Sequence, residues 1–212
     1  MKIDILTLFP EMFEALNYSI VKRAQEKGKI EIKAHNLRNW SIDDHGTVDD
    51  RPYGGGHGMI LRVDVLDAAI KDLAKKNTKI VLLEASGKKF THKVAESYSK
   101  LEHIILVAGH YEGIDHRIHE KVASEIISIG DYVLTGGELP AMVVIDAITR
   151  LIPKVIEKGS LKEESHSKPG YIEYPQYTRP DDYKGWKVPE VLLSGDHKKI
   201  ASWREKKSKR AI

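Results

Sequence analysis

Short apolar runs along the chain alternate with segments whose apolar residues recur at helical spacing. This alternation is typical of an α/β protein with a largely parallel sheet. Five strands are predicted, near Ile3–Leu8, Ile30–Ala34, Ile80–Leu83, His103–Val107 and Glu125–Ile129. Helices are predicted from Pro10, over Val63–Leu73, over His92–Ser99 and over Leu139–Leu151, where Pro153 ends the pattern.

The pattern changes after Pro153. Residues 154–183 are polar and rich in proline, and a loop of about 30 residues is usually functional or disordered. Apolar character returns at Trp186–Leu193, and Asp196 can cap a final helix that continues through Trp203. We therefore expect an α/β domain over residues 1–160, a linker over 161–185 and a short, basic, mostly helical segment over 186–212.

The composition excludes several classes of protein. The 212 residues are 41% hydrophobic, enough for a sizeable core, and no apolar run approaches the length of a membrane span. The absence of cysteine excludes disulfides and thiolate metal sites, and no secretory signal is visible, so a cytoplasmic protein is expected. The net charge is only +3, but Trp203–Arg210 is strongly basic. That run is either a solvated tail or an arm that contacts phosphates.

Two glycine-containing loops directly follow predicted strands. Gly109–Asp115 follows one apolar run, and Gly130–Gly137 follows another and leads into a helix. In that helix Pro140 falls where a missing backbone N–H has no cost. A strand, a tight glycine loop and a helix start expose backbone donors and acceptors that can line a small-molecule pocket. We expect the two loops to form one crevice at the ends of neighbouring strands.

A third glycine cluster, Gly54–Gly56, lies within the segment Thr47–Met59. It is either a sharp surface turn or bare backbone against which a flat ligand lies. The neighbouring Asp49, Asp50 and Arg51 favour a site. The chain has neither a phosphate-binding Gly-Lys-Ser/Thr loop nor a GxGxxG fingerprint, which argues against an NTPase or a dinucleotide dehydrogenase.

Several charged residues are candidates for chemistry. Glu112 and Asp115 could meet the positive centre of a ligand, whereas the nearby histidines lack metalloprotease spacing and a zinc site is set aside. Arg150 either compensates a helix dipole or donates two hydrogen bonds to a carbonyl or phosphate. Glu163 and Glu164 are solvated linker residues unless a partner surface orders the segment and desolvates one carboxylate.

Six segments, taken in order, resemble the bacterial tRNA (guanine-N1)-methyltransferases of the SPOUT superfamily, which modify the guanine 3′ to the anticodon (position 37). The segments are residues 8–13, 48–56, 109–115, 128–142, 177–180 and 188–197. The resemblance extends from residue 3 to about residue 205. It implies a SPOUT-type α/β fold, in which a parallel sheet carries a C-terminal trefoil knot, and a homodimer with its sites at the subunit interface.

The resemblance also implies S-adenosylmethionine as cofactor, bound in the knot. The matching cofactor-binding positions are Leu82, Leu83, Glu84, Gly109, Tyr111, Glu112, Gly113, Ser128, Ile129, Gly130, Tyr132, Leu134, Gly136, Gly137 and Pro140. Contacts to the tRNA anticodon loop are expected from Asp49, Asp50, Tyr53, Gly54, Gly55 and Gly56, and contacts to phosphates from Lys198, Lys199, Arg204, Lys206 and Lys207. The family also implies Mg²⁺, for which the sequence names no ligand.

The implied reaction requires a base and a stabilising cation. Guanine N1 carries a proton at neutral pH, so this proton must leave and the charge that spreads to O6 must be stabilised. In the family, a linker aspartate from the partner subunit is the base, and an arginine at the end of the knot helix contacts O6. Arg150 matches the arginine. The linker has Glu163-Glu164-Ser165 where Asp-Ser is usual, and it is one residue longer before Tyr171, so Glu164 is assigned as the base with Glu163 as the alternative.

Two other interpretations stay open. One is a non-catalytic RNA-binding module that keeps the knot. Two features favour it: the substituted linker, and a chain that stops short of the family's last turn and helix. The C-terminal domain would then be minimal, or the sequence would be part of a longer polypeptide. A SPOUT methyltransferase for another RNA site, such as ribosomal RNA or a 2′-hydroxyl, is disfavoured by the segment Asp49–Gly56, which ribose methylases typically lack.

Overall fold

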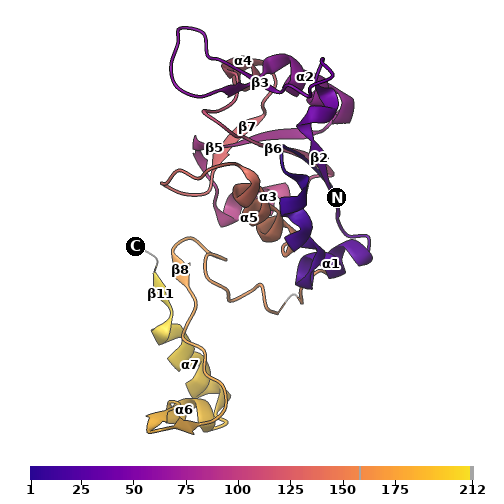
Figure 1. Cartoon of the computed structure of the whole chain (residues 1–212). Coiled ribbons are helices and arrows are strands. Elements are labelled where there is room, and N and C mark those ends of the chain that lie inside the picture. Colours follow the sequence, from indigo (N-terminus) through magenta and orange to yellow (C-terminus); the bar gives the residue numbers. More distant parts are fainter. Residues whose placement is uncertain (158, 211–212) are drawn as a thin grey trace. The chain divides into compact units, whose positions relative to one another are not determined.

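The computed structural model describes residues 1–157 and 159–210, the side chains of 209 and 210 excepted. The chain divides into two compact units, Met1–Ile156 and Glu157–Ile212 (Figure 1). No helix within the described ranges is long and apolar enough to cross a membrane.

A five-stranded sheet forms the centre of the first unit (Figure 1). Its strands are β1 (Lys2–Thr7), β2 (Glu31–Asn36), β5 (Lys79–Lys89), β6 (His103–Ala108) and β7 (Glu125–Ser128). They lie in the order β2-β1-β6-β5-β7, and every neighbouring pair is parallel. The predicted α/β class with a parallel sheet is therefore confirmed.

Helices cover both faces of this sheet (Figure 1). One face carries the 3₁₀ helix η1 (Pro10–Asn17), α1 (Ser19–Glu26), α3 (His92–Tyr98) and α5 (Glu138–Thr149), and the other carries α2 (Val63–Leu73) and α4 (His116–Lys121). Because side chains alternate along a strand, β6 serves two cores: Ile104 and Leu106 pack with α5, whereas Ile105 and Val107 pack with α2. Burial on both faces explains why the strands read as continuous apolar runs.

Some elements differ from those expected. Strand β5 continues to Lys89 because a bulge after Leu83 interrupts its pairing with β7 but does not end it. The short helix α4 was not predicted, because Ile118 is its one buried residue and leaves no apolar stripe. Three further short elements precede α2: η2 (Leu37–Trp40), β3 (Asp49–Asp50) and β4 (Ile60–Leu61).

The second unit is small and has few fully enclosed side chains. It contains β8 (Tyr171–Ile172), the antiparallel pair β9 (Asp182–Tyr183) and β10 (Trp186–Lys187), α6 (Glu190–Leu193), α7 (His197–Lys207) and β11 (Lys209–Arg210), which pairs with β8. Aromatic contacts hold it together. The guanidinium of Arg204 lies 4.8 Å from the ring centre of Tyr174, and the Tyr177 and Trp203 rings are 6.3 Å apart. The predicted cap is confirmed: the Asp196 carboxylate accepts from the backbone N–H of Lys198 and Lys199 at the start of α7.

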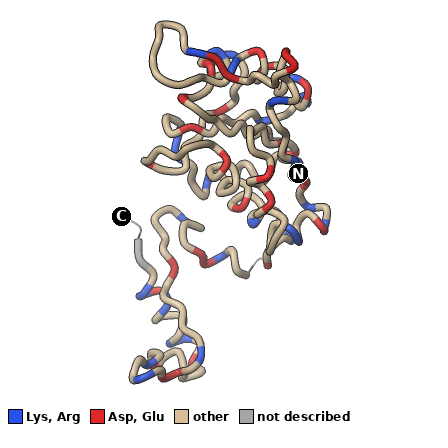
Figure 2. The backbone as a smooth tube through the Cα atoms, viewed as in Figure 1, with Lys and Arg blue, Asp and Glu red and all other residues tan. Residues whose placement is uncertain are grey.

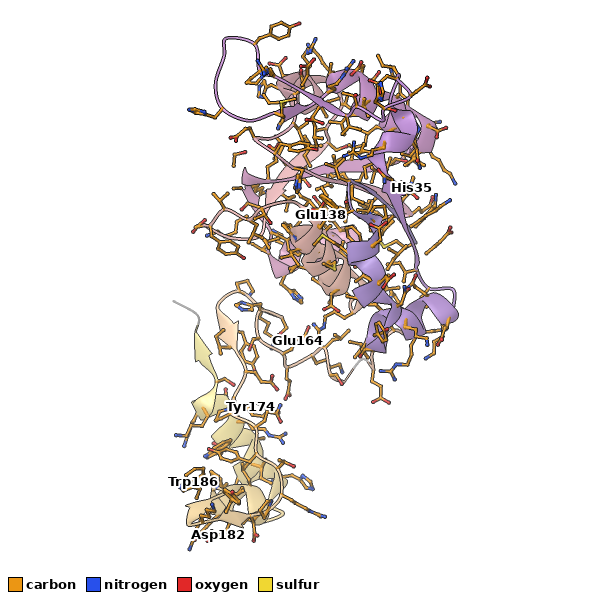
Figure 3. All side chains as sticks on the ribbon, in the orientation of Figure 1. His35, Glu138, Glu164, Tyr174, Asp182 and Trp186 are labelled. Carbon is orange, nitrogen blue, oxygen red and sulfur yellow. The ribbon has the colours of Figure 1, made fainter. Side chains whose placement is uncertain are left out.

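A buried carboxylate links three strands at the amino-terminal side of the sheet. Asp4 on β1 is fully buried. Its Oδ1 lies 2.7 Å from Nε2 of His35 on β2, which is labelled in Figure 3. Its Oδ2 lies 2.7 Å from Nε2 of His103 on β6 and 2.7 Å from Nζ of Lys2. Burial raises the pKa of the Asp4 carboxyl, but the hydrogen bonds from Lys2, His35 and His103 outweigh it, so this pKa lies below its ordinary value.

The stability of the first unit should therefore decrease in acid. A carboxyl whose pKa is lowered by folding stabilises the protein fully above its unfolded pKa of about 3.9, and this contribution is lost as the pH falls through the lower folded value. We expect the urea midpoint of unfolding to fall steeply below about pH 4. Asp4→Asn should be destabilised by about 3–5 kcal/mol at pH 7 and should show a flatter dependence below pH 4. Asp67→Asn removes the ion pair that the half-buried Asp67 makes with the exposed Lys71, and it should retain the wild-type profile.

Candidate active site

A cavity of about 540 Å³ lies at the bulge in β5 and at the carboxyl ends of β6 and β7. Ligands commonly bind in this position on parallel sheets. All the cofactor-binding positions implied by the family resemblance line the cavity except Leu82 and Gly130. Leu82 is fully buried in the core on the α2 side of the sheet. The three segments that the family resemblance places around one pocket thus meet in space.

The bulge in β5 builds one wall of this cavity. Leu83 pairs with Ile127, and after the bulge Lys88 pairs with the same residue. The intervening segment leaves the ladder, and Glu84, Ala85 and Ser86 line the cavity. Sequence reasoning missed Ala85 and Ser86, because an apolar run that ends at Leu83 does not indicate that strand pairing resumes at Lys88.

The loops after β6 and before α5 touch through their backbones. The N–H of Gly137 donates to the carbonyl of Gly109 at 2.8 Å. A Cβ at position 137 would lie 2.6 Å from the Cα of Ala108 and 2.7 Å from the nitrogen of Gly109, closer than real Cβ atoms come. Only glycine allows these two walls of the cavity to meet.

A methyl group at position 137 should therefore be costly. We expect Gly137→Ala to destabilise the first unit by about 1–3 kcal/mol, because the atoms that the methyl group meets are backbone and cannot swing away. Chemical denaturation followed by circular dichroism measures this loss. Gly159→Ala is the matched control, since its added Cβ would meet no atom within 4 Å. Equal stability of the two variants would contradict the close approach.

The lining of the cavity combines apolar and acidic side chains. Ile126, Ile129 and Leu134 supply apolar surface of the kind that accepts a flat aromatic group, and Glu84 and Glu112 supply carboxylates suited to a cation. Nε2 of His119 lies 2.7 Å from Oε2 of Glu84 and holds that carboxylate in place. No sequence pattern indicates this pairing, because α4 itself was not expected. Over the described residues, no group of three or more histidine or acidic side chains could hold a metal ion.

The third glycine cluster lies in the exposed segment that precedes β4. Gly54, Gly55 and Gly56 all have positive φ and are exposed, so they form a sharp surface turn. The chain on its carboxyl-terminal side is tied to the loop after β6 by three backbone hydrogen bonds. They run from Glu112 N to Met59 O at 2.9 Å, from Leu61 N to Gly113 O at 3.0 Å and from Asp115 N to Leu61 O at 3.1 Å.

The expected substrate contacts on this segment do not line the cavity. Asp49 and Asp50 form β3, which pairs with β4, and Tyr53 is fully exposed at the start of the turn. The structure thus ties Met59 and Leu61, which follow the glycine turn, to the loop after β6 and leaves the turn itself exposed.

The two expected catalytic residues belong to different units. Arg150 is the C-cap residue of α5 in the first unit and is half-buried. Glu164 lies in the second unit, is half-buried, and its carbonyl accepts from Ser167 N at 3.1 Å. Glu163, the alternative base, is exposed, and its Oε2 accepts a hydrogen bond from the Tyr174 hydroxyl at 3.2 Å. Burial and the Glu163 carboxylate raise the pKa of Tyr174, so this hydroxyl remains a donor to Glu163.

Comparison with known proteins assigns the chain to a family. The family model described as "tRNA (Guanine-1)-methyltransferase TrmD" matches residues 1–212. Proteins named tRNA (guanine-N(1)-)-methyltransferase are similar to the chain: that of Macrococcus caseolyticus is 55% identical over 205 residues, covering 96% of this chain and 85% of the relative. Those of Dictyoglomus turgidum and Carboxydothermus hydrogenoformans are 51% and 53% identical over 210 residues, covering 98% of this chain and 85% and 83% of the relatives. The chain therefore belongs to the tRNA (guanine-1)-methyltransferase family.

Proposed function

We propose that this protein transfers a methyl group from S-adenosylmethionine to N1 of the guanine 3′ to the anticodon, position 37, of tRNA. The observation that carries the proposal is the cavity at the bulge in β5 and the carboxyl ends of β6 and β7, lined by the loops that the family resemblance assigns to the cofactor. The full-length match to the family supports the same activity.

The cavity is suited to this cofactor. When bound, S-adenosylmethionine supplies an electrophilic methyl group on a positively charged sulfur. The apolar Ile129 and Leu134 can pack against its adenine, and the carboxylates of Glu84 and Glu112 can balance the charges of its sulfonium and ammonium groups. The glycine loops let backbone donors and acceptors approach it closely. The proposal includes a trefoil knot in the segment that carries these loops.

Arg150 and Glu164 perform the chemistry in this proposal. Glu164 removes the proton from guanine N1, which frees the lone pair for attack on the methyl carbon. Arg150 donates hydrogen bonds to O6 as negative charge develops there. The linker over residues 161–185 would bring Glu164 to the site of a partner subunit. Mg²⁺ is part of the proposal as an additional requirement, but no step depends on it, because no ligand for it is identified.

Exposed apolar side chains support a homodimer. Phe9 and Met12 at η1, and Leu139 and Val143 on α5, are large and exposed, and η1 and α5 contact each other. Adjacent apolar side chains on a surface usually mark an interaction site. A second copy of the chain is the partner that a site assembled from two subunits requires.

Basic residues of the second unit support a tRNA substrate. Helix α7 carries exposed Lys198, Lys199, Arg204, Lys206 and Lys207, with Glu205 as its one acidic residue (Figure 2). In the first unit, Lys and Arg are interspersed with Asp and Glu (Figure 2). Contacts of these basic side chains with phosphates would make binding weaken as salt increases. The target base would leave the anticodon-loop stack at little cost, because the loop is single-stranded. A cytoplasmic location follows from this substrate.

The test is methyl transfer from labelled S-adenosylmethionine to two tRNA transcripts that differ only at position 37, guanine in one and adenine in the other. Label should appear in the guanine transcript alone, as 1-methylguanine after digestion to nucleosides. Binding of both transcripts without transfer would support a non-catalytic module instead, and label at another nucleotide or at a ribose would support a different RNA site.

A further inference from the structure

A buried carboxylate that the proposed chemistry does not use lies beside the cavity wall. Glu138 is the first residue of α5 and is only 2% exposed (Figure 3). Its Oε1 accepts a hydrogen bond from Oγ1 of Thr7, the last residue of β1, at 2.8 Å. A carboxylate removed from water is costly unless both oxygens find partners. The partner of Oε2 is therefore informative.

The side chain that faces Oε2 is His110. Its Nδ1 lies 3.9 Å from Glu138 Oε2, is itself buried and makes no hydrogen bond to any described residue. A hydrogen bond between nitrogen and oxygen needs about 2.9 Å. The ring is held by edge contacts with Phe9 and Tyr111, whose centres are 5.2 and 5.1 Å away. The Glu138 carboxylate and a buried ring nitrogen thus face each other about 1 Å too far apart to bond.

Gly136 faces both of these groups. A Cβ at Gly136 would lie 2.3 Å from Glu138 Oε2 and 2.7 Å from His110 Nδ1. Gly136 and His110 both line the cavity, one from the loop before α5 and the other from the loop after β6. A closing movement of about 1 Å between the two loops would complete the hydrogen bond. A ligand that contacts both loops would favour the closed arrangement.

We propose that Thr7, Glu138 and His110 form a clasp that positions the two walls of the cavity around the cofactor. In the bound state Nδ1–H of His110 donates to Oε2 of Glu138, whose other oxygen is held by Thr7. This inference rests on the proposed function, because it requires S-adenosylmethionine in the cavity. The three residues are positioning residues, which act through the loops and not on the reacting atoms.

A purely structural role is the competing explanation. Glu138 lies in the first turn of α5, where the helix dipole stabilises a carboxylate without help from His110. In that case the substitutions would lower the melting temperature and leave the affinity of the folded protein for the cofactor unchanged. Cofactor affinity, measured well below the melting temperature of each variant, separates the two roles.

The experiment is calorimetric titration of the full chain with S-adenosylmethionine and with S-adenosylhomocysteine. Thr7→Val removes the hydroxyl and keeps its shape, and His110→Phe keeps the ring and removes Nδ1. Each should weaken binding of both ligands about 10- to 100-fold. Glu138→Leu should do the same, whereas Glu138→Gln should recover most of the affinity, because its carbonyl can accept from Thr7 and its NH₂ can donate to Nδ1 of the His110 tautomer protonated at Nε2. The double variant T7V/H110F should be weakened by less than the product of the two single effects.

Thr149→Val is the matched control. Like Thr7→Val, it removes a buried threonine hydroxyl, here that of Thr149 on α5. This hydroxyl donates to the carbonyl of Ile145 at 2.7 Å, and Thr149 does not line the cavity. It should lower stability without changing affinity. Affinities of Thr7→Val and His110→Phe within twofold of wild type, or an equal loss in Thr149→Val, would overturn the clasp. Failure of the wild type to bind either ligand would instead overturn the proposed function. If Glu138→Leu does not fold, Thr7→Val and His110→Phe alone test the clasp.

Discussion

Glu164→Gln should lower the rate of methyl transfer about 10²- to 10⁴-fold under single-turnover conditions with saturating cofactor and tRNA. Glutamine is close to glutamate in size but cannot accept the guanine N1 proton, so the nucleophilic lone pair remains blocked. Because the carboxylate acts on the guanine, affinity for S-adenosylmethionine should stay near the wild-type value. Quench-flow measurement of labelled tRNA gives the rate, and calorimetry gives the affinity.

Glu163→Gln is the matched control for this experiment. Glu163 is the adjacent acid of the same segment, and its carboxylate already accepts a hydrogen bond from Tyr174. Its substitution should leave single-turnover methylation within a few-fold of wild type. The reverse outcome, a slow Glu163→Gln and a fast Glu164→Gln, would transfer the role of base to Glu163. Two fast variants would place the base elsewhere in the chain.

Arg150→Ala should lower single-turnover methylation about 10²- to 10³-fold, the usual effect of removing a donor that stabilises developing charge. Arg150→Lys should recover only part of this loss, because an ammonium cannot make the paired hydrogen bonds of a guanidinium. Binding of tRNA should weaken much less than turnover, since the charge on O6 develops only as the proton leaves. Single-turnover rates and filter-binding affinities measured on the same preparations separate the two effects.

Arg23→Ala controls for the simpler explanation that Arg150 only compensates a helix dipole. Arg23 occupies the last turn of α1, in the same first unit. If Arg150 acted through its helix alone, both substitutions would change stability by a few tenths of a kcal/mol and neither would slow methylation. Unchanged chemistry in Arg150→Ala would remove Arg150 from the mechanism.

Much of the fold could be predicted from the sequence because its signals are local. The apolar runs of β1 and β6 and the helical spacing of α2 show which segments are strands and which are helices. The cap at Asp196 is readable for the same reason, since an N-cap bonds only to residues two or three positions further along. Helix α4 escaped prediction, because one buried residue, Ile118, is too little signal for any periodicity.

Part of the candidate site could be predicted in the same way. The glycine loops after β6 and before α5 were identified from sequence and lie on one cavity. Ala85, Ser86 and His119 line the cavity too, but no pattern around them indicates this. Their positions depend on a bulge and on an unexpected helix. The roles of Arg150 and Glu164 remain predictions.

By itself, the sequence determined most of the longer elements, the class of fold and the two glycine loops that line the cavity, because these depend on residues close together in the chain. Only the tertiary structure decided which side chains from distant segments meet: Thr7 with Glu138, 131 residues apart, and Asp4 with His103, 99 residues apart. Such pairings follow from strand order and from the register of one strand against the next. A buried carboxylate is therefore indistinguishable in sequence from an exposed one until the chain has folded around it.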